Sequence, residues 1–232
     1  MRPSFVTQIV LALCVGISLE CNASRPEEDH LVPLKEEYGS SAAYQQLWQD
    51  KLLLTPGETA RFISLPGTVG VETAISVYQT PGKEKSLPGN YWVTVTQASD
   101  RLWNCIDQSG EHRVDPNTIR VERCDAPIPK SLALLLNKLW LTMLSQSRPP
   151  PARNEIVVDS SRESVSTVGS DGKLLEGESS AAPGENTKAL TKIAASLMNY
   201  CDSHEPQRGE LARKIQKIAS KLLARLGTTK QR

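Results

Sequence analysis

The chain has 232 residues, with 27 lysines and arginines against 26 acidic residues, which gives a formal charge of +1 at pH 7. This length allows one domain of ordinary size with an appendage, and a near-neutral charge excludes selection of a partner class by bulk charge alone. The histidines are far apart, at His30, His112 and His204, and the sequence has no zinc-helix motif, phosphate loop, dinucleotide-binding glycine pattern or Gly-x-Ser-x-Gly elbow. We therefore expect no metal and no cofactor, and we assign no catalytic residue.

The first 23 residues have the features of a secretory signal peptide. Arg2 supplies a positive charge, residues 5–19 form a mostly apolar run, and residues 21–23 (Cys-Asn-Ala) provide a small-x-small cleavage site. The alternative is an uncleaved anchor helix, but an apolar run of 15 residues is shorter than the roughly 20 that span a bilayer. We expect cleavage before Ser24 and a secreted, periplasmic or cell-envelope location.

Two of the five cysteines lie in this signal, so export would place Cys105, Cys124 and Cys201 in an oxidising compartment. Cys105 and Cys124 are the natural disulfide pair by their separation. Closing a loop of about 20 residues would contribute roughly 3 kcal/mol to stability. Cys201 is then left over, either buried as a small apolar side chain or available for an intermolecular bridge.

The next segments predict a leader followed by a β-rich domain. Residues 24–43 are acidic and contain two prolines, which favours a flexible acidic leader. The β-rich domain, residues 44–147, contains strand-like runs separated by turn signals. These runs are 61–65, 69–77, 91–96, 102–106 and 118–123. The gaps between them leave no room for crossover helices, so the pattern favours a small antiparallel sheet, sandwich or barrel.

Residues 131–146 close this domain as a helix, with Ser131 at the position of an N-cap. The apolar stripe is so wide that the helix must be covered on most of its circumference. At 16 residues it is too short to span a membrane, and we expect it to pack across the open face of the sheet. Insertion into lipid or into the groove of a partner is the alternative.

The C-terminal part predicts a linker and a helical hairpin. Residues 148–186 have the Ser, Gly and Glu content of a disordered linker, residues 187–227 form the hairpin, and residues 228–232 form a tail. The second helix has one apolar seam, made of Leu211, Ile215, Ile218, Leu222 and Leu226. From residue 208 to the end there are eight basic residues and one acid, a local charge of +7. Two short helices are marginal alone, so the seam must be buried against the first domain, a second copy or another partner.

Five side chains are candidates for binding. Trp92 has the strand parity opposite to Val93 and Val95, so its ring would be exposed for stacking on a sugar or a partner unless a helix covers it. Trp103 is a second aromatic in a candidate strand. The basic face of the last helix carries Lys214, Lys217 and Lys221. These lysines either contact an anionic membrane surface or form an ordinary solvated face.

These features predict an exported α+β protein: a small antiparallel β-sheet or sandwich covered by a helix, with a C-terminal helical hairpin after a flexible linker. We expect a non-enzymatic binding or scaffolding function in the cell envelope or extracellular space. The partner would be an unknown protein or a glycan, with self-association through the hairpin, and no nucleic acid is expected. One alternative is a peripheral membrane protein that uses the basic helix. Another is a hydrolase with a site on the sheet loops, involving His112 and Asp107 or Asp115.

Overall fold

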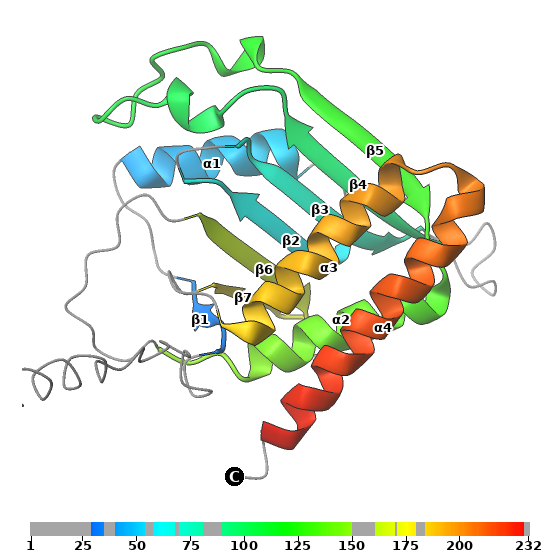
Figure 1. Cartoon of the computed structure of the whole chain (residues 1–232). Coiled ribbons are helices and arrows are strands. Elements are labelled where there is room, and N and C mark those ends of the chain that lie inside the picture. Colours follow the sequence, from blue (N-terminus) through cyan, green and yellow to red (C-terminus); the bar gives the residue numbers. More distant parts are fainter. Residues whose placement is uncertain are drawn as a thin grey trace, which may run out of the picture.

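The computed structural model describes residues 29–34, 40–53, 58–67, 70–80, 90–149, 161–169, 171–179 and 184–229. Within them, a seven-stranded antiparallel sheet has the order β1-β7-β6-β2-β3-β4-β5. The strands are β1 (Val32–Pro33), β2 (Glu58–Leu65), β3 (Thr73–Gln79), β4 (Tyr91–Ala98), β5 (Val121–Pro127), β6 (Arg162–Val168) and β7 (Leu174–Glu178). The helices are α1 (Ser40–Leu52), α2 (Lys130–Ser145), α3 (Glu185–Asp202) and α4 (Glu205–Thr229). Helices lie on both faces of the sheet (Figure 1), which confirms the predicted α+β class.

The sheet alternates its side chains between two faces, as the period-two pattern predicts. Phe62 on β2 is paired with Ile75 on β3 and with Val165 on β6. Ile75 is in turn paired with Val95 on β4, and all four side chains belong to one buried apolar cluster. This row faces α2, α3 and α4, and we call that side of the sheet the helical face.

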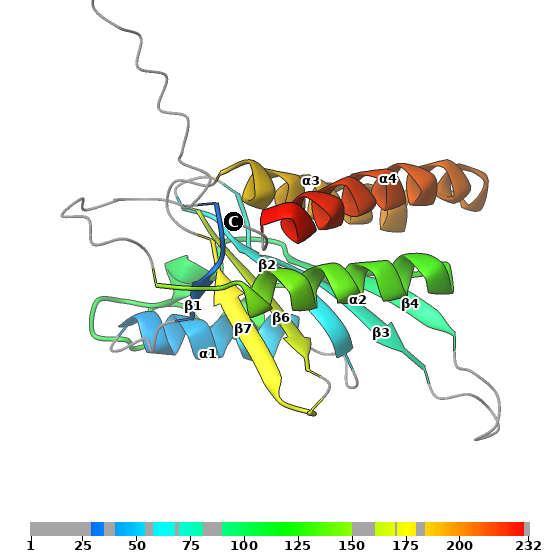
Figure 2. The same cartoon turned by 90° about the horizontal axis from the view of Figure 1, so that it is seen from below.

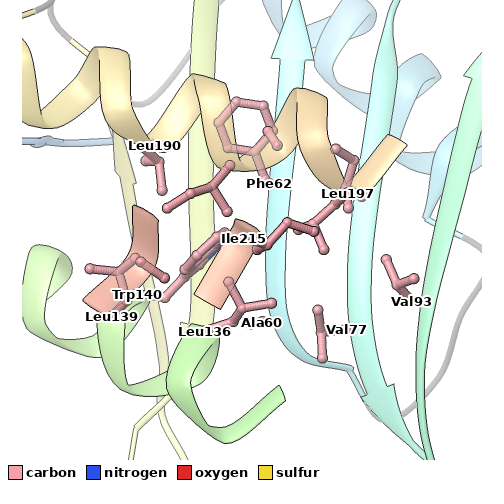
Figure 3. Close-up of a cluster of buried hydrophobic side chains, with 14 of the residues drawn as sticks. Ala60, Phe62, Val77, Val93, Leu136, Leu139, Trp140, Leu190, Leu197 and Ile215 are labelled. Atoms are coloured by element: carbon pink, nitrogen blue, oxygen red, sulfur yellow. The ribbon is translucent and has the colours of Figure 1, made fainter. Parts of the chain in front are cut away.

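Two layers of helix cover the helical face. α2 packs on β2, β6 and β7, and α3 packs on β3, β4 and β5, while α4 packs on α2 and α3 (Figures 1 and 2). In Figure 3, Phe62 from the sheet, Trp140 from α2 and Ile215 from α4 gather in the same core. Trp140 is 2% exposed, and its indole nitrogen donates to the carbonyl of Arg61 at 2.8 Å, so burial leaves that donor satisfied. The predicted packing of the apolar helix across the sheet, and the predicted hairpin, are confirmed.

The opposite face of the sheet is covered at one end by α1, and we call it the α1 face. Tyr44, Trp48 and Leu52 from α1 pack on Ile63 and other sheet side chains in a second cluster. Glu72 lies inside this region with 0% exposure. Its carboxylate accepts a hydrogen bond from the Tyr44 hydroxyl at 2.7 Å, and therefore ties α1 to the sheet.

The predicted linker is wrong where the structure describes it. Residues 162–168 form β6, an interior strand between β2 and β7, and residues 174–178 form β7. β6 resembles a linker because its buried positions include Ser164, Ser166 and Thr167, and Val165 is its only large apolar core residue. Residues 150–160, 170 and 180–183 of the predicted linker lie outside the described residues.

The described part of the predicted flexible leader also has fixed contacts. Leu31 is 0% exposed, and Val32 and Pro33 form β1, which pairs with β7. The Asp29 carboxylate accepts hydrogen bonds from the backbone amides of Asn186 and Thr187, at the start of α3. A carboxylate at this point satisfies amides that have no partner within the helix and complements its dipole. Residues 1–28, including the predicted signal peptide, and tail residues 230–232 lie outside the described residues.

The strand predicted over residues 102–106 is also wrong. Leu102–Cys105 forms a short 3-10 helix, and Glu72 caps it by accepting from the backbone amides of Leu102 at 2.9 Å and Trp103 at 3.2 Å. The capping carboxylate lies 30 residues upstream in the sequence. A local pattern of apolar residues therefore gives no sign of it.

The predicted disulfide between Cys105 and Cys124 is wrong as well. Cys124 is paired in the sheet with Val95, which places it on the helical face, where it bonds to Cys201 of α3. Cys105 is buried in the cluster under α1 and has a free thiol. Because the sheet separates Cys105 from Cys124, the shorter loop cannot close.

Candidate functional site

Trp92 lies on the α1 face of β4, away from the three helices that cover the other face. The prediction that Val93 and Val95 share one face is confirmed, since both belong to the helical core. Trp92 is half-buried, and its direct neighbours across the strands are Tyr78 on β3 and Pro127 on β5. The hairpin and α2 therefore do not cover this ring, and two aromatic side chains stand next to each other on the sheet.

A charged pair lies beside these rings on the edge strand β5. Arg123 Nε donates to Asp125 Oδ2 at 2.8 Å, and its terminal nitrogen donates to Oδ1 at 2.9 Å. The Thr94 hydroxyl also donates to the Asp125 carboxylate. This two-point geometry fixes both planar groups, yet their side chains remain 37% and 36% exposed.

Electrostatics keep this carboxylate ionised. The pKa of Asp125 lies below its usual range, first because Arg123 donates to it and then because of the Thr94 and Tyr78 hydroxyls. The same pairing raises the pKa of Arg123. We call the group of Trp92, Tyr78, Thr94, Arg123 and Asp125 the Trp92 surface.

Among the described residues, α1 covers only part of the α1 face. It reaches β4 at Thr96, whose hydroxyl donates to the carbonyl of Leu52 at 2.8 Å. At the other side of the sheet, the paired Val168 and Leu174 point to the α1 face and are 41% and 56% exposed. The end of the sheet that carries Trp92 therefore presents aromatic and aliphatic side chains to solvent.

Trp103 lies elsewhere and does not join Trp92. It belongs to the 3-10 helix Leu102–Cys105, its ring meets Tyr44 edge-on with centroids 4.9 Å apart, and it is 40% exposed. Beside it opens a hollow of about 340 Å³. The hollow is lined by Ser99, Asp100, Arg101, Asn104, Cys105, Val114, Thr118 and Ile119. Burial, reinforced by Asp100 and Glu72, raises the pKa of the Cys105 thiol. Cys105 therefore does not provide a reactive thiolate in the lining of this hollow.

The three predicted lysines lie together on α4. Lys214, Lys217 and Lys221 are exposed, on the helix face opposite the buried Ile215 and Leu222. The hairpin seam is buried against α2 and α3 of the same chain. Of the three partners considered for the seam, the structure places the chain's own domain there, and the seam is no free surface.

The residues considered for a hydrolase serve other contacts. Asp107 accepts hydrogen bonds from the backbone and hydroxyl of Ser109 and from the Glu111 backbone, and the Ser109 hydroxyl is the main cause of its lowered pKa. Asp115 accepts from the Asn117 backbone. Within the described chain, neither carboxylate is hydrogen-bonded to the exposed His112. In the same residues, no group of three His, Cys, Asp or Glu side chains is arranged to hold a metal ion.

Comparisons with models of protein families, with curated proteins and with solved structures find no match.

Sequence reasoning found Trp92 but missed its neighbours Tyr78, Arg123 and Asp125. The signal for Arg123 and Asp125 was available as an i, i+2 pair of opposite charges, which share one face of a strand. The predicted strand ended at residue 123, however, whereas β5 continues to Pro127. Tyr78 joins them only through the register of β3 with β4.

Proposed function

We propose that the protein is an exported, non-enzymatic binding protein that recognises a glycan on the Trp92 surface. The observation that carries this proposal is the juxtaposition of two neighbouring aromatic side chains with a preformed, half-exposed Arg123–Asp125 pair. Aromatic rings bind the apolar faces of sugars, and planar charged groups hydrogen-bond hydroxyls in two-point fashion. The surface is built on strands, so a ligand would meet a rigid arrangement.

Export is part of the same proposal. The first 23 residues have signal-peptide composition, and the Cys124–Cys201 bond is compatible with an oxidising compartment. Among the described helices, none combines the length and the apolar character that crossing a bilayer requires.

Titration of the labelled protein with a panel of soluble oligosaccharides tests this function. The panel contains cello-oligosaccharides, xylo-oligosaccharides, chito-oligosaccharides and muropeptide fragments. Binding is followed by NMR through the tryptophan indole N–H resonances. One stacked ring and one bidentate pair support an affinity on the order of 0.1–1 mM. We expect one sugar class to shift the Trp92 resonance and leave those of the buried Trp48 and Trp140 in place.

Matched variants locate the contact. Trp92→Ala should weaken the binding at least tenfold. Asp125→Asn should also weaken it, because it removes the negative charge and one of the two acceptor oxygens that Arg123 orients. Trp103→Ala removes an indole that is 40% exposed and lies outside the surface, and should leave the affinity unchanged. The proposal is wrong if no sugar shifts the Trp92 resonance, or if Trp103→Ala weakens binding as much as Trp92→Ala.

A further inference from the structure

We propose that the outer face of α4 docks the protein onto a negatively charged lipid surface, independently of the Trp92 surface. The face consists of Arg213, Lys214, Lys217 and Lys221, and we call it the basic α4 face. It belongs to the helical side of the sheet, whereas Trp92 lies on the α1 face, so both surfaces remain usable at once (Figure 2).

The four basic residues form one continuous row. All four side chains are exposed, and spacings of three and four residues place them on one side of a helix. From Arg213 to Lys221 the row covers about 12 Å at 1.5 Å per residue. Several positive charges therefore face the same direction within one or two lipid headgroups of each other.

Their charge is not compensated by neighbours in the structure. Within the described residues, none of the four groups forms an ion pair with a carboxylate. The acids of α4, Glu205 and Glu210, lie in its first two turns, on the N-terminal side of the row. Glu210 lies three and four residues before Arg213 and Lys214, on the same face of the helix. The positive charge that attracts an anionic partner is therefore strongest around Lys217 and Lys221.

The rest of α4 holds the row in place. Ile215 and Leu222 are 0% and 1% exposed, and α3, on which α4 packs, is linked to β5 by the Cys124–Cys201 bond. Because these apolar residues are already buried, α4 has no apolar face to insert between lipid chains. The contact is electrostatic and remains at the level of the headgroups.

The shape and chemistry of the face favour a lipid surface over a soluble polyanion. α4 is an outer helix that packs on two others, so it forms a ridge and not a groove that would enclose a polymer chain (Figure 1). Three of the four residues are lysines, whose compact positive charges are attracted by the negative surface potential of an anionic membrane. Arginine forks are better suited to two-point recognition of individual sulfates or phosphates. No aromatic side chain lies in the row to stack on a sugar.

Vesicle sedimentation with the purified oxidised protein tests the proposal. The vesicles contain either pure phosphatidylcholine or phosphatidylcholine with 40% phosphatidylglycerol, at low and at high salt. Each lysine or arginine near an anionic surface raises the partition coefficient about fivefold. We expect binding to the anionic vesicles only, lost at high salt because the ions screen the contact.

Two variants of equal charge change locate the contact. The first variant combines Lys214→Glu, Lys217→Glu and Lys221→Glu. It should lower the partition coefficient for anionic vesicles about 100-fold or more. The control variant reverses three exposed charges that lie outside α2, α3 and α4, through Arg113→Glu, Arg120→Glu and Lys173→Glu. It should retain most of the binding. Circular dichroism confirms that both variants are folded.

Three results would overturn the proposal. They are equal binding to neutral and anionic vesicles, equal loss in both triple variants, and no binding to anionic vesicles at low salt. Retention on immobilised heparin without vesicle binding would assign the face to a soluble polyanion, and would overturn the lipid contact in the same way. None of these results depends on whether Trp92 binds a glycan, since Trp92→Ala should sediment with vesicles like the parent protein.

Discussion

Cys124 on β5 is joined by a disulfide to Cys201 near the end of α3, with their Cα atoms 6.0 Å apart. The bond links residues 77 positions apart and holds the helical hairpin on the edge of the sheet that also carries Arg123 and Asp125. It therefore stabilises the backbone of the Trp92 surface as well as the support of the basic α4 face.

Replacing both cysteines of this bond with serine should lower the free energy of unfolding by about 4–5 kcal/mol, because the unfolded chain regains the entropy of a long open loop. Urea unfolding followed by circular dichroism measures the change. Cys105→Ala removes a buried thiol outside the bond and should cost only about 1 kcal/mol. Similar losses in the two variants would contradict the pairing.

Alkylation without reductant should label Cys105 and neither of the other two described cysteines. The Cys105 side chain is 1% exposed and burial raises the pKa of its thiol, so labelling should be slow in the folded protein and rapid in denaturant. Peptide mass spectrometry locates the label. Finding it on Cys201 would instead favour the pairing of Cys105 with Cys124.

Glu72→Ala should cost about 3 kcal/mol or more, because the Tyr44 hydroxyl and two backbone amides of the 102–105 turn all lose a buried acceptor. Tyr44→Phe removes one of these bonds and should cost about 1 kcal/mol. Thermal unfolding of both variants checks the order. Gln46→Ala, which breaks only an exposed contact on the same helix, should stay within about 0.5 kcal/mol of the parent.

Glu163 should make stability depend on pH. Burial raises the pKa of its carboxyl, and the hydrogen bond from Thr191 at 2.7 Å opposes that rise. A raised folded-state pKa means that this group's stabilising effect is complete below the unfolded-state pKa, about 4.3, and is lost as the pH rises through the folded-state value.

Glu163→Gln, which carries no charge at any pH, should therefore be more stable than the parent at pH 7 and lose this advantage near pH 4. Chemical unfolding at a series of pH values measures the difference between the two proteins. The exposed Glu122→Gln serves as control and should show a flat difference. A Glu163→Gln advantage that grows on acidification would contradict the assignment.

The sequence by itself determined the local features of this protein. The alternation of side chains in residues 91–96 determined which of them share a face of β4. The wide apolar stripe of residues 131–146 determined a helix that must be covered. The spacing of apolar residues in 187–227 determined a helical hairpin with a basic outer side. Each is a property of contiguous residues, because a strand repeats every two residues and a helix every 3.6.

Only the tertiary structure decided which distant residues meet. It placed a serine-rich segment as an interior strand, Glu72 at the start of the 102–105 turn, Cys124 opposite Cys201, and Tyr78 with the Arg123–Asp125 pair around Trp92. The physical reason is that strand order and register bring together side chains tens of residues apart. Those contacts depend on the burial and packing of the whole sheet, which no local period records.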